Sequence, residues 1–187
     1  MIDLQPFCGT DECRFYLMKP FSRDGFTWAT DGHIMVRVAL REDVPDTSKA
    51  FKQGTPLEGI DSATFLRPMF ELPPAPTQIG PCKACEGRGC DHDCPDCECI
   101  CEKCHGSGDM DAEKAISTNI GAEVFCLAYV RQMLSLPEVE IETPRTKSSM
   151  KPFFFRFAEG VGVLMPRRGE NKEHVDIKLS SPLSSPQ

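Results

Sequence analysis

Eight of the eleven cysteines in this 187-residue chain lie between Cys82 and Cys104, and their spacing limits what this stretch can fold into. Two copies of the phrase C-x-x-C-x-G-x-G begin at Cys82 and Cys101, and the 15 residues 86–100 separate the two cysteine pairs. This is the spacing of a four-cysteine zinc site, in which each pair lies on one tight turn and the two turns complete a tetrahedron. The sequence therefore predicts a zinc ion bound by Cys82, Cys85, Cys101 and Cys104.

Four further cysteines and a histidine lie between the two outer pairs, namely Cys90, His92, Cys94, Cys97 and Cys99. Cys94 and Cys97 form another C-x-x-C pair, so they could bind a second zinc ion that Cys90, His92 or Cys99 completes. The irregular spacing does not select one set of ligands. We expect one zinc ion and leave a second as an open alternative.

The composition is that of a soluble globular protein, with 40% hydrophobic and 26% charged residues. The sequence contains no apolar run that could cross a bilayer and no signal peptide at its start. We therefore expect a cytoplasmic protein without a membrane partner. In a reducing cytosol, clustered cysteines bind metal more often than they form disulfides.

The net charge of −7 argues against a protein that coats nucleic acid through bulk charge. Between Cys82 and Cys104 there are six acidic and three basic residues, so this segment would repel phosphate and is better suited to docking a protein. Residues 119–168 are different, with seven basic and five acidic residues. A local basic surface is therefore possible in the C-terminal half.

An enzyme is not expected. The sequence has no G-x-S-x-G, P-loop or dinucleotide-binding motif. Four paired cysteines would also close the coordination sphere that a catalytic zinc ion must keep open. Cys101–His105 spells the C-x-x-C-H of haem attachment, but that chemistry normally follows export, for which no signal is present.

Alternating apolar residues and turn signals predict most of the secondary structure. Three strands are expected in the N-terminal part, at residues 14–18, 26–30 and 34–40, with a turn at 22–25 and a hairpin at Asp31-Gly32. Residues 41–67 predict only a short helix or loop. A helix over 120–136, with Glu123 in its first turn, is then followed by strands at 139–143, 153–157 and 161–165.

The fold class predicted from these elements is α+β, with an antiparallel sheet and an inserted zinc module. Residues 1–67 and 109–168 would form one discontinuous domain. Residues 68–108 would be a proline-rich linker and the cysteine module, and residues 169–187 a flexible polar tail.

The repeated C-x-x-C-x-G-x-G phrase resembles the zinc-binding region of DnaJ-type co-chaperones. That family has four such repeats and two zinc ions, whereas this chain has two full repeats and the bare Cys94/Cys97 pair. The His-Pro-Asp motif of the J-domain is absent from the sequence. The resemblance covers about two dozen residues and implies zinc binding without co-chaperone activity.

A second resemblance involves Phe26–His33, which reads FTWATDGH and is similar to a hairpin of the bacterial DNA polymerase III beta sliding clamp. The phrase Val163–Arg167 (VLMPR) is similar to one that closes the last domain of that family. The resemblance implies βαβββ units whose helices face DNA. This chain departs from the family because no helix is predicted near its N-terminus and because it supplies one domain where a bacterial clamp subunit has three.

The clamp resemblance implies a phage-related binding factor of DNA metabolism, which could surround DNA only as an oligomer. Arg131, Arg145 and Lys147 are then the candidate phosphate contacts. The alternative is a zinc-stapled module that binds a protein partner, on a clamp-like fold that does not bind DNA.

Overall fold

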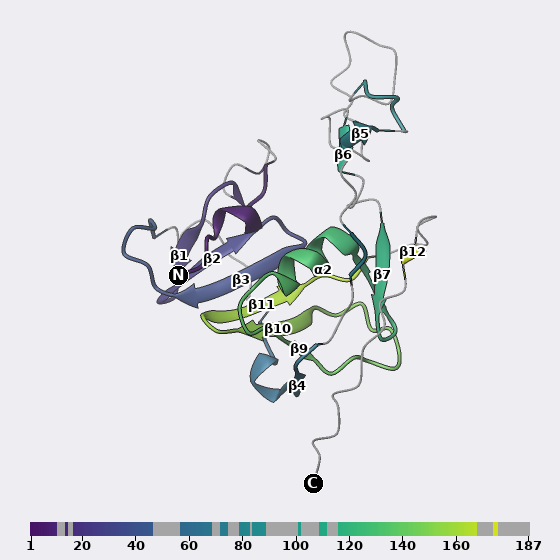
Figure 1. Ribbon diagram of the computed structural model, residues 1–187. Helices are drawn as coiled ribbons and strands as arrows, with labels where there is room; N and C mark the ends of the chain where they lie inside the picture. The colour runs from purple at the N-terminus through teal and green to yellow at the C-terminus, as the bar shows by residue number, and fades with distance from the viewer. Residues whose placement is uncertain are drawn as a thin grey trace.

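The computed structural model describes residues 1–10, 14, 17–46, 57–68, 72–74, 79–82, 84–88, 101, 109–111, 116–167 and 174–175. Its largest element is an antiparallel sheet of seven strands, which Figure 1 shows beneath a helix. In spatial order the strands are β1 (Phe21–Arg23), β2 (Phe26–Thr30), β3 (Ile34–Ala39), β11 (Gly160–Leu164), β10 (Phe153–Phe157), β9 (Glu140–Glu142) and β4 (Phe65–Leu66). The α+β class is confirmed.

The predicted hairpin at Asp31-Gly32 joins β2 to β3 and pairs Thr30 with Met35. The Asp31 carboxylate closes the turn by accepting hydrogen bonds from the backbone N–H groups of His33 (2.8 Å) and Ile34 (3.0 Å). An aspartate side chain favours a turn for this reason, because it replaces a backbone acceptor. The prediction of strands on either side was correct.

The predicted first strand, at residues 14–18, was wrong. The first strand is β1 at Phe21–Arg23, and Leu17 lies in a short turn. The reason is the Asp24-Gly25 turn, where both residues have positive φ values (52° and 76°), as a two-residue hairpin requires. Such a turn fixes the register at once, so pairing starts directly beside it and extends back to Phe21.

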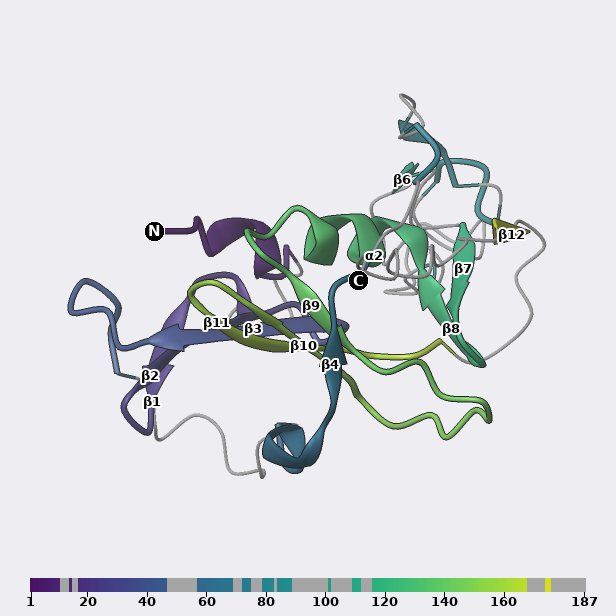
Figure 2. The same ribbon diagram turned by 60° about the horizontal axis from the view of Figure 1, so that its bottom comes forward.

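The two faces of the sheet bury different side chains, as the two-residue period of a strand dictates. One face carries the larger core, formed by residues such as Val36, Ile141 and Phe155. The helix α2 (Leu127–Leu134) packs on this face through Val130 and Met133. Figure 2 shows α2 and the N-terminal residues together on this side of the sheet.

A smaller core lies on the opposite face, where Trp28, Met35 and Val163 contact Leu57 and Ile60. The 3-10 helix Ile60–Ser62 is therefore packed on the side away from α2, as Figure 2 also shows. The predicted short helix or loop in residues 41–67 thus includes this 3-10 helix and the edge strand β4.

The predicted helix over 120–136 was wrong in its first half. A hairpin of β7 (Ser117–Ile120) and β8 (Glu123–Cys126) precedes α2, which begins only at Leu127. Gly121 explains the difference, because its φ of +64° belongs to a turn and a Cβ there would lie 2.6 Å from the carbonyl oxygen of Arg145. The three strands predicted after the helix are present as β9, β10 and β11.

Two short strands, β5 (Ile79–Pro81) and β6 (Asp109–Asp111), pair antiparallel on either side of the cysteine segment. Figure 1 shows this two-stranded stem away from the large sheet. β12 (His174–Val175) pairs parallel with β7, within the segment predicted as a flexible tail. The remaining residues of that tail lie outside the described part of the chain.

Candidate metal centre

Three cysteines form the candidate site beyond the end of the β5–β6 stem. Cys82, Cys85 and Cys101 are each fully buried, and their Sγ atoms all lie within 4.8 Å of one another. The Sγ atoms of Cys82 and Cys101 are 3.9 Å apart, almost twice the length of a disulfide bond. A tetrahedral zinc ion with Zn–S bonds of about 2.3 Å places its sulfur ligands ~3.8 Å apart, so this spacing suits thiolates that share a metal ion.

A tight turn after Cys82 directs the first pair of thiols to one side. The backbone N–H of Gly87 donates to the carbonyl of Cys82 (3.1 Å), and that of Arg88 donates to the carbonyl of Cys85 (2.9 Å). Glu86 and Gly87 have φ values of 52° and 84°. The first glycine of the phrase, Gly87, is therefore in the left-handed conformation, and Glu86 shares it.

The structure brings together three of the four cysteines predicted for the outer site, and they could hold a metal ion. The fourth, Cys104, lies outside the described residues, as do Cys90, His92, Cys94, Cys97 and Cys99. The fourth ligand and the second zinc ion therefore stay predictions. Among the residues that the structure describes, these three cysteines are the one group of metal-binding side chains close enough to share an ion.

The candidate phosphate contacts lie in different surroundings. Arg131 is half-buried on α2, and its Nη2 donates to the carbonyl of Pro73 at 2.5 Å. Lys147 is exposed in the loop before β10. Arg145 lies in the same loop and forms a two-pronged ion pair with Glu142, from which its Nη2 is 2.9 Å distant. A role for these three residues in DNA binding stays a prediction.

A buried carboxylate beside Arg145 was not foreseen. Glu123 is fully buried and accepts hydrogen bonds from the backbone N–H of Ser149 (2.6 Å), its hydroxyl (2.9 Å) and the hydroxyl of Ser148 (2.9 Å). Arg145 Nη1 lies 3.5 Å from the same carboxylate. Burial acts to raise the pKa of Glu123, but these hydrogen bonds and the guanidinium charge outweigh it, and the pKa is lowered.

The Glu123 cluster holds the loop 144–152 against the β7–β8 hairpin. Part of this cluster was recognisable in the sequence, since Glu142 and Arg145 are three residues apart and two serines follow. The sequence could not show that the loop folds back onto Glu123, which is more than twenty residues away.

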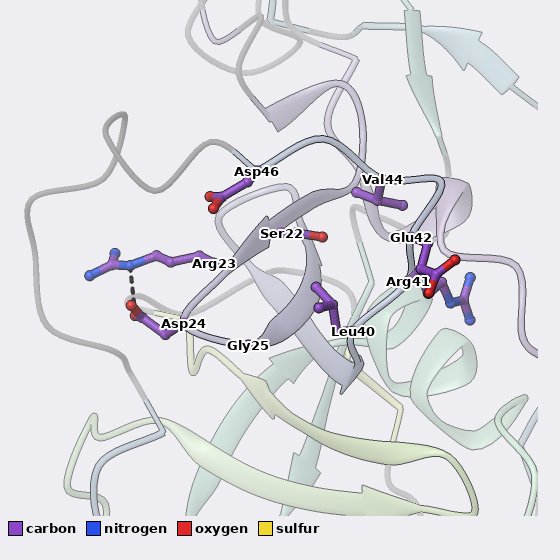
Figure 3. A pocket seen from close by; sticks show the side chains of 9 residues that line it. All are labelled: Ser22, Arg23, Asp24, Gly25, Leu40, Arg41, Glu42, Val44 and Asp46. Atoms are coloured by element: carbon purple, nitrogen blue, oxygen red, sulfur yellow. Dashed lines mark hydrogen bonds and ion pairs between the residues drawn. The ribbon is translucent and has the colours of Figure 1, made fainter.

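Two pockets at the surface offer no convergent set of reactive groups. The first, of about 250 Å³, is lined by Ser22, Arg23, Asp24, Gly25, Leu40, Arg41, Glu42, Val44 and Asp46. Figure 3 shows Arg23 and Asp24 directed toward each other at one end and the side chains of Arg41 and Glu42 at the other. The second pocket includes Arg145 and Glu142, which already pair with each other.

No protein-family model matches this chain, and neither a search of curated proteins nor one of solved structures gives a match. Function must therefore be inferred from the residues themselves. In the part of the chain that the structure describes, no helix is both long and apolar enough to cross a membrane.

Proposed function

We propose that this chain is a non-enzymatic binding protein in which a structural zinc ion folds an inserted cysteine module. The observation that carries the proposal is the group of three fully buried cysteines, Cys82, Cys85 and Cys101, with Sγ atoms within 4.8 Å. Three converging thiolates favour a soft or borderline cation, and a nearly tetrahedral sulfur site is typical of zinc. A fourth protein ligand would close the coordination sphere, which is why we propose a structural and not a catalytic ion.

We further propose that the module binds a protein partner. The stem of β5 and β6 lies away from the large sheet (Figure 1), and the described residues 86–88 that follow it are exposed. The sequence of the module is acidic, with six acidic residues against three basic ones between Cys82 and Cys104. A basic protein surface would complement this charge, whereas nucleic acid would be repelled.

Metal analysis of the full-length protein tests the zinc site. We expect native mass spectrometry to find at least one zinc ion in the wild type and one fewer in Cys85→Ser. Cys126→Ser is the matched control, because Cys126 is also buried but lies in β8, in the other part of the molecule. If Cys85→Ser keeps the same zinc content as Cys126→Ser, the site is not where we propose it.

Removal of the metal tests its structural role. Because Trp28 is the single tryptophan and lies in the large sheet, its fluorescence reports on that domain alone. A chelator should leave this fluorescence unchanged while making the cysteines reactive toward a thiol reagent. Thiols that remain protected after the zinc has been removed would contradict a metal-folded module.

A second candidate function is DNA binding by a clamp-like domain. It is favoured by the way in which the two clamp-like phrases meet, since the backbone N–H of Met165 donates to the carbonyl of His33 at 2.8 Å. The strands that carry both phrases also share one sheet, with α2 packed on one of its faces. This arrangement supports the second candidate function.

Fluorescence anisotropy with duplex DNA at low salt, together with native mass measurement for a ring, tests the second candidate. Lys147→Glu is the cleaner variant, because Lys147 is exposed. Arg131→Glu would also remove the hydrogen bond to Pro73 and so alter the linker. If duplex DNA does not bind at low salt to any oligomer, the clamp-like function is refuted, and the zinc proposal is unaffected.

A further inference from the structure

The sheet face opposite α2 carries a row of side chains that crosses five strands. Trp28 on β2 pairs with Arg37 on β3, and Arg37 pairs with Val161 on β11. Val161 pairs with Arg156 on β10, which pairs with Glu140 on β9. Residues that are directly opposite one another on neighbouring strands point to the same face. Two arginines and an aromatic ring therefore lie in one line across the sheet.

Arg37 lies between two aromatic rings. Its Cζ atom is 4.3 Å from the centre of the Phe26 ring and 5.5 Å from that of Trp28. Among the residues that the structure describes, no carboxylate pairs with Arg37, although it is half-buried. The ring of Phe26 is 38% exposed, which is unusual for a phenylalanine in a strand. Arg37 thus presents an uncompensated positive charge next to an accessible aromatic ring.

Arg156 repeats this arrangement three strands from Phe26. Its Cζ atom is 4.8 Å from the centre of the Phe65 ring, and its side chain is 52% exposed. It forms an ion pair with Glu140, which is itself partly exposed. An exposed pair of this kind contributes little to stability, so a phosphate group can replace the carboxylate at small cost.

Two other carboxylates near the row are paired with arginines. Asp24 pairs with Arg23 at 3.0 Å, and Glu142 pairs with Arg145 at 2.9 Å. Asp24, Glu140 and Glu142 thus each have an arginine as partner, whereas Arg37 has no carboxylate partner among the described residues. Glu58 and Asp61 are exposed on the segment that packs on this face through Leu57 and Ile60, at the part of the face away from Arg156.

We propose that this face, centred on Phe26, Arg37 and Arg156, binds single-stranded nucleic acid. Proteins that bind single strands combine arginines for the phosphates with aromatic rings on which bases stack. Phe26 and Arg156 offer exposed groups of both kinds beside the part of this face that Leu57 and Ile60 cover. An acidic peptide would satisfy the charge of Arg37 but would not use the exposed ring of Phe26. This binding goes beyond the proposed function, because it requires neither the zinc ion nor the cysteine module.

The test is a titration of the full-length protein with a fluorescein-labelled oligothymidine at low salt, read by anisotropy. The fluorescence of Trp28, the single tryptophan, gives a second and local readout, since Trp28 lies beside Arg37. We expect binding that quenches Trp28 and weakens as salt is added. A duplex of the same length should bind more weakly than the single strand, because its bases are not free to stack.

Three variants separate the parts of the surface. Phe26→Ala should weaken binding by about 5- to 150-fold, the range for loss of one base–aromatic stack. Arg37→Gln should weaken binding and reduce the salt slope by ~0.7, the value for one phosphate contact on a single strand. Lys19→Gln is the control, because it removes an exposed charge outside the row. Its affinity should fall only by the small amount that any loss of one positive charge on the protein causes.

Several outcomes would overturn the proposal. These are the absence of oligothymidine binding at low salt, equal binding of duplex and single strand, and equal losses in Phe26→Ala and Lys19→Gln. A loss confined to Lys147→Gln would place the nucleic acid elsewhere on the domain. Displacement by an acidic peptide at equal charge concentration would show that the surface recognises charge alone. Arg37→Lys is the control for misfolding. It keeps the positive charge, so a folded variant should keep the salt slope of the wild type although its affinity falls.

Discussion

Replacement of Glu123 by glutamine should destabilise the protein strongly, although the two side chains have nearly the same size. Glu123 is fully buried and receives three hydrogen bonds from Ser148 and Ser149, one of which joins its carboxylate to a backbone N–H at 2.6 Å. An amide has one acceptor oxygen in place of two. The NH2 group of the glutamine would therefore point at one of the donors of Ser148 or Ser149, and that donor would be left without an acceptor.

The expected loss in the free energy of unfolding follows from the hydrogen-bond donors that are left without an acceptor. Hydrogen bonds to a charged group contribute about 1.5–3 kcal/mol each, and breaking a buried ion pair from one side costs about 3–5 kcal/mol. Arg145 keeps its contact with Glu142 at 2.9 Å, so its charge is not left without a partner. We therefore expect Glu123→Gln to lower the free energy of unfolding by ~3 kcal/mol, the low end of that range.

Urea unfolding followed by Trp28 fluorescence at pH 7 measures the change, and Glu140→Gln is the matched control. Glu140 also pairs with an arginine, Arg156, but both side chains are partly exposed. The control should therefore lose less than about 1 kcal/mol. Equal losses in the two variants would refute the argument that burial and hydrogen bonding at Glu123 stabilise the fold.

The comparison of the wild type with Glu123→Gln also gives a prediction about pH. The pKa of Glu123 is lowered in the folded protein from its ordinary value of 4.5, so the unfolded chain binds the proton more tightly. The stability that the charge contributes is fully present above the ordinary pKa and is lost as the pH falls through the lowered one. The difference between wild type and Glu123→Gln should thus shrink on acidification below pH 4.5. A difference that stays constant down to the acid limit of folding would contradict it.

Two further predictions concern Gly162 and Cys8. Gly162→Ala should lower the free energy of unfolding by about 1–3 kcal/mol, because the new Cβ would meet the Phe155 ring and lie 2.5 Å from the carbonyl oxygen of Met35. Gly80→Ala, where the same atom meets nothing within 4 Å, is the control for thermal unfolding, and equal shifts in Tm would show that the close contact does not matter. Cys8 should be alkylated far more slowly in the folded protein than in urea at pH 8, because burial and the charges of Asp3 and Asp31 raise its pKa to about 11. Similar rates in the two states, measured by mass spectrometry, would show that the thiol is not protected.

Local chemistry made the strands of the large sheet predictable. Asp31-Gly32 fixed a hairpin through side-chain hydrogen bonds that need no distant partner. The run Phe153–Phe157 alternates in burial, whereas in the run after Gly160 the last three residues are all buried. The pairing of β3 with β11 follows from no local pattern and could not be predicted from either strand alone.

The helix prediction failed for a tertiary reason. Residues 120–136 carry apolar side chains at helical spacing, but Gly121 is held in a turn by Arg145, whose carbonyl accepts from the N–H of Ala122 at 2.8 Å. Glu123 was predicted to lie in the first turn of this helix and is instead buried in β8. At the metal centre, the spacing of Cys82, Cys85 and Cys101 was sufficient to predict that their thiols lie together.

The antiparallel pairing of β5 with β6 has a consequence for how easily the module can be exchanged. When Ile34 pairs with Leu164, the chain between them forms a loop of 130 positions (164 minus 34). The stem pairs Ile79 with Asp111 and so takes 32 positions (111 minus 79) out of this loop. By loop-closure entropy this shortening is worth only ~0.3 kcal/mol to the sheet. The host domain therefore gains almost nothing from whatever the stem carries, and loses almost nothing without it. A short turn, or a different module of any length that returns the chain to Asp109 beside Pro81, should be accepted at the same place.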